Sequence, residues 1–187
     1  FPTRRSSDLK SVLKELGKAA ANYAMDIIED NSIIALTGGT TVKEVVDSFP
    51  KNNKYKNILV LPARGGMARN VEMQANTLVA RLANRIGGNY ELLHVPDNLS
   101  NAALETILNE KDIKNIIDKI RSADILLYGI GIAKDMALKR GIPQKKIREL
   151  EELGAVGEAF GQYYNELGEI VYSTPTIMVK KDRKSVV

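Results

Sequence analysis

The chain has 187 residues, no cysteine and no tryptophan, and its formal net charge at pH 7 is +4. Without cysteine it can form neither a disulfide framework nor a thiolate metal site, which agrees with a reducing cytoplasm. No apolar run approaches the roughly 20 residues of a membrane-spanning helix. The length fits one α/β domain, or most of one, and we expect a cytoplasmic location without a membrane partner.

The two ends of the chain differ in character from the rest. Residues 1–9 and 182–187 resemble the translation of a common DNA-sequencing adapter read on opposite strands, and each carries one net positive charge. We therefore expect the native sequence to be residues 10–181, an internal fragment that is truncated on its C-terminal side as well. Because that part carries only +2, its charge is no argument for nucleic-acid binding.

The chain is organised around residues 31–49. Lys10–Asp30 has apolar residues at spacings of three and four, which predicts a helix leading into this stretch. The apolar run Ile33–Leu36 then predicts a short strand, which breaks at two glycines and restarts as an amphipathic helix that includes Val42 and Val46. The stretch carries neither a Walker A loop nor the Gly-x-Gly-x-x-Gly dinucleotide fingerprint.

The break between strand and helix is Gly38-Gly39-Thr40-Thr41. A strand that turns into a helix at paired glycines directs backbone N–H groups, and the positive end of the helix dipole, at a bound anion such as phosphate. Thr40 or Thr41 is expected to cap the helix and to offer a hydroxyl to a ligand oxygen. The alternative is a glycine turn with a threonine cap and no ligand.

The rest of the chain alternates strands with helices. Ser100 is expected to cap one helix, and Gly87 to close another. The further helices expected are Asn70–Ile86, Asn101–Leu108, Ile113–Arg121, Ala133–Lys139 and Pro143–Leu153. The further strands expected are Asn57–Pro62, Tyr90–Val95, Ala123–Tyr128 and, after a glycine-rich apolar stretch, Glu169–Ser173. This alternation predicts an α/β fold with a parallel, Rossmann-like sheet flanked by helices.

Three of the predicted strand ends carry glycines, at Gly38–Gly39, Gly65–Gly66 and Gly129–Gly131. In a parallel sheet the C-terminal ends of the strands meet at one edge, where ligands bind. A single glycine-bearing strand end indicates only a turn. Three of them at one edge of the sheet predict a ligand-binding pocket.

Charged residues near these ends suit a phosphate ligand. Arg64 follows a strand end, where its guanidinium could bind a phosphate bidentately; the alternative is an arginine in solvent. Lys139 and Arg140 end a helix, where cations are favourable for electrostatic reasons alone, although a role at a second phosphate is open.

Two further residues could bind the hydroxyl groups of a sugar. Glu158 lies in an apolar, glycine-rich run, where a carboxylate needs either hydroxyl donors, such as those of a sugar, or a buried arginine. Gln74 could bind a sugar oxygen or lie on the surface. The single histidine, His94, is expected to be a packing residue. No catalytic set is visible, so we expect binding without turnover.

Six blocks occur in a characteristic order and spacing. They are Thr37–Thr41, Val60–Gly66, Gln74–Asn76, His94–Ser100, Gly129–Gly131 and Ala155–Gly161. Together they resemble the sugar-binding effector domain of SorC/DeoR-type bacterial transcription regulators, and the resemblance covers essentially all of residues 10–179.

The resemblance implies a fold akin to sugar-phosphate isomerases and glucosamine-6-phosphate deaminase, used as a sensor without turnover and without a cofactor. Within this family the chain looks most like a repressor of glycolytic genes, and the effector of that repressor is fructose-1,6-bisphosphate. By matching position, Gly38–Thr41 and Arg64 would hold one phosphate, Gln74 and Glu158 would face the sugar, and Lys139–Arg140 would approach the other phosphate. A lysine stands at 139 where the family has an arginine pair.

The resemblance also implies partners. Operator DNA would bind through an N-terminal winged-helix domain outside this chain, further C-terminal strands would complete the site, and the parent protein would be a homo-oligomer. Two alternatives remain: a sugar-phosphate isomerase or deaminase on the same fold, which needs an acid/base pair beside the phosphate, and an oligomerisation domain with a vestigial pocket.

Overall fold

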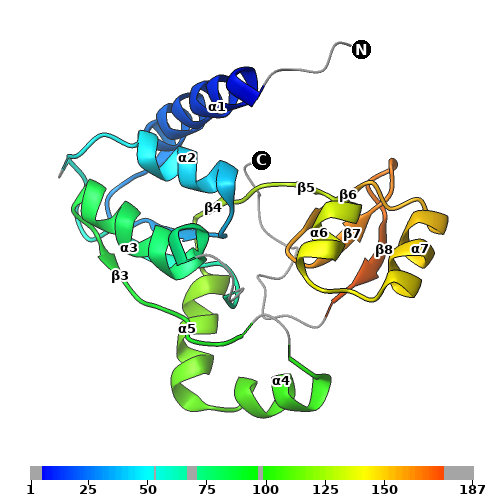
Figure 1. Cartoon of the computed structure of the whole chain (residues 1–187). Coiled ribbons are helices and arrows are strands. Elements are labelled where there is room, and N and C mark those ends of the chain that lie inside the picture. The colour runs from blue at the N-terminus through cyan, green and yellow to red at the C-terminus, as the bar shows by residue number, and fades with distance from the viewer. Residues whose placement is uncertain (1–5, 53, 67–70, 97–98, 175–187) are drawn as a thin grey trace.

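The computed structural model describes residues 6–52, 54–66, 71–96 and 99–174, which contain two sheets (Figure 1). The first sheet is parallel, in the order β3-β2-β1-β4. Its strands are β1 (Ile33–Leu36), β2 (Leu59–Pro62), β3 (Asn89–Tyr90) and β4 (Ile125–Leu127). Continuous apolar runs form β1 and β2 because helices cover both faces of this sheet.

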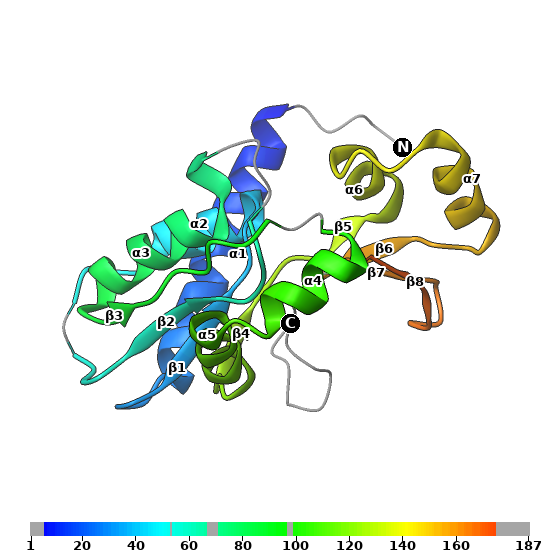
Figure 2. The same ribbon diagram turned by 90° about the horizontal axis from the view of Figure 1, so that it is seen from below.

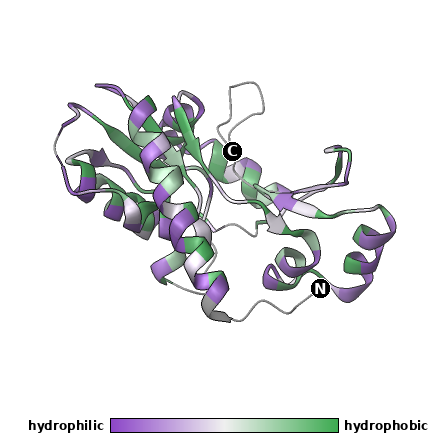
Figure 3. Ribbon diagram, turned by 90° about the horizontal axis from the view of Figure 1, so that it is seen from above, coloured by the Kyte–Doolittle hydropathy of each residue, from purple (hydrophilic) through white to green (hydrophobic). Residues whose placement is uncertain are grey.

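Helices pack on both faces of the parallel sheet. One face is covered by α1 (Ser6–Ile27), α2 (Thr40–Ser48) and α3 (Ala75–Ile86), and the other by α4 (Asn101–Leu108) and α5 (Lys111–Arg121). Figure 3 shows the apolar strands lying between helices with polar outer surfaces. Among the helices of the described ranges, none is long and apolar enough to cross a membrane.

Two predicted helix ends are confirmed. The side-chain hydroxyl of Ser100 accepts a hydrogen bond from the N–H of Ala103 at 3.2 Å, so Ser100 caps α4. Gly87 adopts the left-handed conformation (φ 70°) and closes α3. That conformation is open to glycine at no steric cost.

The prediction of a strand over Tyr90–Val95 is wrong beyond its first residue. β3 ends at Tyr90, and the backbone of Leu93 instead pairs with the side chain of Asn76 on α3. The Asn76 amide donates to the carbonyl of Leu93 at 3.1 Å and accepts from its N–H at 3.3 Å. Because this amide satisfies both backbone groups of a buried residue, the segment needs no neighbouring strand.

The second sheet is antiparallel, in the order β5-β6-β7-β8. Its strands are β5 (Gly131–Ile132), β6 (Gly157–Ala159), β7 (Gln162–Tyr164) and β8 (Ile170–Ser173). The helices α6 (Ala133–Lys139) and α7 (Gln144–Glu152) pack beside it around a separate small core. The sequence predicted a strand at β8 but not this sheet. Figure 2 shows it beside the parallel part.

Two side-chain contacts join the two sheets where the chain passes from β4 to β5. The rings of Tyr128 and Phe160 lie with their centroids 4.7 Å apart, and the guanidinium of Arg64 lies 3.7 Å from the carboxylate of Glu158. The boundary between the sheets therefore coincides with the strand ends that carry the predicted site.

Candidate functional site

The C-terminal ends of β2, β1 and β4 lie side by side at one edge of the parallel sheet. Leu36 is opposite both Pro62 and Leu127 in the strand register. The N–H of Thr37 donates to the carbonyl of Leu127 at 3.0 Å, and the N–H of Ala63 to that of Leu36 at 2.8 Å. The prediction that the glycine-bearing strand ends share one edge is confirmed.

The turn after β1 differs from the prediction in its cap. Gly39 is the N-cap of α2, with φ 124° and ψ 164°, and no side chain caps the helix, so the predicted cap by Thr40 or Thr41 is wrong. This backbone conformation is essentially open to glycine alone, and it places both threonines within the first turn. The Thr40 hydroxyl donates instead to the sulfur of Met73 at 3.7 Å.

The beginning of α2 retains the features that suit an anion. The N–H of Gly39 is bonded to the carbonyl of Met73 at 2.9 Å, so the remaining donors are those of the helix's first turn. These N–H groups have no partner within the helix, and the dipole makes this end positive. Thr41 lies against the end of β4, since a Cβ placed on Gly129 would lie 3.9 Å from the Cβ of Thr41.

Gln74 lies beside the glycine turn. It is the half-buried N-cap of α3, and a Cβ added to Gly38 would lie 2.4 Å from the carbonyl oxygen of Met73 and 3.5 Å from the carbonyl carbon of Gln74. Only glycine at position 38 lets the two turns approach so closely. The structure therefore brings Gln74 to the edge where the sequence placed it.

Arg64 is buried, with 8% of its surface exposed, so the alternative of an arginine in solvent is wrong. It follows β2 at the same edge, and its Nη1 lies 3.7 Å from Oε1 of Glu158 across the boundary between the sheets. A buried arginine presents its planar fork of donors with little remaining freedom, which suits a bidentate anion ligand.

Glu158 and Arg140 form a buried ion pair in the antiparallel part. Nη2 of Arg140 donates to Oε1 of Glu158 at 2.8 Å, and the N–H of Gly161 donates to the same oxygen. The sequence left sugar hydroxyls or a buried arginine as partners of Glu158, and the structure provides the arginine. The predicted Lys139–Arg140 pair divides, because Lys139 is exposed on α6 while Arg140 turns inward.

Tyr163 is a residue of this cluster that sequence reasoning missed. Its side chain is fully buried on β7, and its hydroxyl has no hydrogen-bond partner among the described residues. Burial raises the pKa of Tyr163 to about 12, with a smaller opposing effect of the Arg140 charge. The preceding run Ala155–Gly161 offered no signal for it, because the pairing of β6 with β7 is what brings it inward.

His94 is exposed, so the expectation that it is a packing residue is wrong. The described residues contain no group of three or more potential metal ligands. A hollow of about 250 Å³ lies between α1, α2 and Tyr128, but its lining is mostly apolar, with Leu16, Tyr23 and Ile27 contributed by α1. Such a lining cannot pair with a charged ligand.

Comparison with known proteins identifies the family. Residues 3–183 match the sequence model described as "Putative sugar-binding domain". The chain belongs to this family of sugar-binding domains. Among the solved structures, a SorC family transcriptional regulator from Enterococcus faecalis is 33% identical with a TM-score of 0.81, over 93% of this chain and 72% of that one.

Curated relatives agree with this assignment. The sugar-binding domain is 38% identical over 171 residues to the central glycolytic genes regulator of Bacillus subtilis, and 38% over 172 residues to that of Priestia megaterium, each match covering 91% of this chain. It spans about half the length of these relatives. The full-length sorbitol operon regulator SorC of Klebsiella pneumoniae shares the fold (22% identity, TM-score 0.80, 90% of this chain and 56% of that one).

These relatives are named as regulators, which agrees with the expectation of a sensor rather than an enzyme. The isomerase or deaminase alternative requires an acid/base pair beside the phosphate. Glu158, the buried carboxylate of the predicted site, is instead engaged by arginine.

Proposed function

We propose that this chain is the effector-sensing domain of a repressor of glycolytic genes, and that it binds a phosphorylated sugar, with fructose-1,6-bisphosphate the favoured ligand. The observation that carries the proposal is the position of buried Arg64 beside the glycine turn that begins α2, at one edge of the parallel sheet. Helix N-terminal N–H groups and a guanidinium are two recurrent phosphate-binding elements.

In this proposal Gly38, Gly39, Thr40 and Thr41 hold one phosphate together with Arg64. Gln74 lies beside the turn and binds a sugar oxygen. Arg140 and the exposed Lys139 serve the second phosphate of a bisphosphate. These roles are supported by the family membership and by the common edge at which the strand ends meet.

The proposal extends to the whole protein. Operator DNA binds through a winged-helix domain outside this chain, and the protein acts as a homo-oligomer in the cytoplasm without a cofactor. The effector changes operator affinity only in so far as it binds one arrangement of that protein more tightly than another. The names of the curated relatives support this role.

Thermal unfolding with a panel of sugars tests the ligand class. We expect fructose-1,6-bisphosphate to raise the Tm most, fructose-6-phosphate and glucose-6-phosphate less, and free fructose not at all. A ligand at about 100 times its Kd adds about 2.7 kcal/mol of stability, which is a rise in Tm of roughly 5–10 °C for a domain of this size. A rise led by a monophosphate would favour a sibling regulator, and no rise with any of them would contradict the proposal.

A further inference from the structure

Met73 contacts the glycine turn through both its backbone and its side chain. It ends η1 (Val71–Met73), a short 3₁₀ helix directly before the N-cap of α3. Its carbonyl accepts the hydrogen bond from the N–H of Gly39 at 2.9 Å, and its sulfur accepts one from the Thr40 hydroxyl at 3.7 Å. The thioether of Met73 therefore lies next to the first turn of α2.

The proposed function requires the Thr40 hydroxyl to donate to a phosphate. A hydroxyl carries one donor hydrogen, so a phosphate that accepts it takes the place of the Met73 sulfur. A thioether is a weak acceptor, whereas a hydrogen bond to a charged phosphate oxygen is a strong one, so this exchange is favourable. Unmodified Met73 therefore holds Thr40 near the site without competing strongly for its proton.

The contact between Thr40 and Met73 is open to solvent. Thr40 is exposed and Met73 is half-buried, so a dissolved oxidant can reach the sulfur. Two other methionines of the described residues are placed differently. Met25 packs against the core of the parallel part, and the sulfur of Met136 would lie 2.8 Å from a Cβ placed on Gly131. Oxidation at Met73 thus acts directly on a residue of the proposed phosphate site.

Oxidation of the thioether changes this contact. Hydrogen peroxide transfers one oxygen atom to the sulfur: the O–O bond breaks, an S–O bond forms, the sulfur is oxidised and the peroxide leaves as water. The product, methionine sulfoxide, is polar, and its oxygen is a stronger acceptor than a thioether sulfur. That oxygen retains the Thr40 proton and brings partial negative charge to the place of the phosphate, so anion binding becomes weaker.

We propose that Met73 is a modification site, at which oxidation to the sulfoxide weakens the binding of phosphorylated sugars to the glycine turn. This inference rests on the proposed function. The response of the domain then depends on peroxide as well as on the sugar. Methionine sulfoxide reductases reverse the oxidation, so the change is reversible.

Calorimetric titration of fructose-1,6-bisphosphate into the full chain, before and after treatment with hydrogen peroxide, tests the inference. We expect peptide mass spectrometry to find one added oxygen on Met73. The affinity of the treated wild type is expected to fall about tenfold or more, the size of one lost hydrogen bond to a charged group.

Two variants, each compared with its own untreated form, show whether Met73 is responsible. Met73→Leu nearly conserves the side-chain volume but has no sulfur, and we expect peroxide to leave its affinity unchanged. Met25→Leu is the matched control, because it removes a methionine that packs against the core away from the turn. We expect peroxide to lower its affinity as it does that of the wild type.

Three results would overturn the inference: Met73 that peroxide does not modify, oxidised Met73 with unchanged affinity, and an equal loss in the wild type and Met73→Leu. Untreated wild type that binds no phosphorylated sugar would overturn the proposed function and this inference with it. The two failures are distinguishable, because the titration of untreated protein alone decides the proposed function.

Partial oxidation of the wild type gives a measurement that does not depend on a variant folding. We expect the loss of binding to follow the fraction of Met73 that is oxidised and not the fraction of Met25. The two methionine sulfoxide reductases, one for each sulfoxide epimer, are expected to restore the original affinity together. Affinity that stays low after complete reduction would place the damage elsewhere and contradict the role of Met73.

Discussion

Replacing Arg140 by alanine lowers the free energy of unfolding by about 3–5 kcal/mol, because it removes the hydrogen-bonded partner of a buried carboxylate. Glu158 is 2% exposed and Arg140 is 8% exposed, so water cannot substitute for the lost guanidinium. Urea unfolding of the full chain measures the loss. The long side chain of Arg140 also fills space beside the antiparallel sheet, which adds to the effect.

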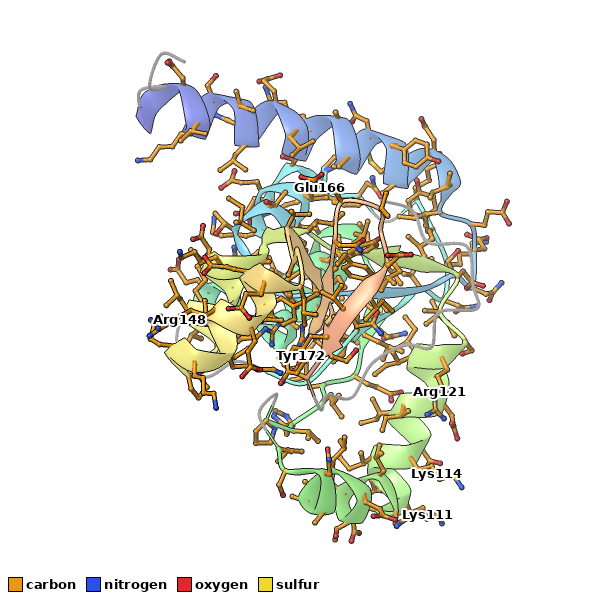
Figure 4. All side chains as sticks on the ribbon, turned by 90° about the vertical axis from the view of Figure 1, so that its right-hand side faces the viewer. Lys111, Lys114, Arg121, Arg148, Glu166 and Tyr172 are labelled. Carbon is orange, nitrogen blue, oxygen red and sulfur yellow. The ribbon has the colours of Figure 1, made fainter. Side chains whose placement is uncertain are left out.

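Arg148→Ala is the matched control for this prediction. Arg148 lies on the outer surface of α7 in Figure 4 and is exposed, and we expect its removal to change stability by less than about 0.5 kcal/mol. Equal stability of Arg140→Ala and Arg148→Ala would contradict the buried ion pair.

The second large effect is expected at Gly38. An alanine Cβ at this position would lie 2.4 Å from the carbonyl oxygen of Met73 and 3.1 Å from the backbone N of Ala75. Both are backbone atoms, so the segment before α3 has to move as a unit. We expect Gly38→Ala to lower stability by about 1–3 kcal/mol and to abolish measurable binding of phosphorylated sugars, because the turn and Gln74 separate.

Gly66→Ala tests the specificity of that result. Gly66 follows β2 at the same edge, but a Cβ there meets no described atom within 4 Å. We expect urea unfolding and ligand titration of this variant to match the wild type. If Gly38→Ala also behaved like the wild type, the close approach of the two turns would not exist in solution.

The sequence predicted well what depends on local pattern. The bounds of β1 were predicted residue for residue, and Gly87 and Ser100 end and begin helices as their chemistry indicates. The common edge of the strand ends also followed from the sequence, because parallel strands linked by helices have little freedom of arrangement.

The remaining features depend on contacts that are distant in sequence. Strands of two or three residues, such as β5 and β6, are too short to show a periodic pattern in the sequence. Their place in a sheet with β7 and β8 is visible only in the folded structure. The side chain of Asn76, 17 residues away in the sequence, forms the backbone hydrogen bonds of Leu93 that a neighbouring strand would otherwise form. Thr40 or Thr41 was the expected cap, but the backbone conformation of Gly39 decided where α2 begins.

Glu158 is a residue whose need for a partner could be predicted from the sequence, but whose partner could not. A carboxylate in an apolar, glycine-rich run is unfavourable without a hydrogen-bond donor or a cation, so a sugar hydroxyl and a buried arginine were both left as alternatives. The choice between them rested on whether α6 ends beside β6, which no local pattern encodes. The role of Arg64 was open for the same reason, since its burial depends on the antiparallel part lying against the strand ends.

The central claim is that Arg64 and the glycine turn of α2 form a site for a phosphorylated sugar. Calorimetric titration of fructose-1,6-bisphosphate into the wild type, Arg64→Ala and Arg148→Ala tests it most directly. We expect binding at one site in the wild type, the same affinity in Arg148→Ala, and a loss of at least about 30-fold in folded Arg64→Ala, as for a charge-assisted hydrogen bond of about 2–3 kcal/mol. Equal affinity in all three proteins would place the ligand elsewhere and contradict the account.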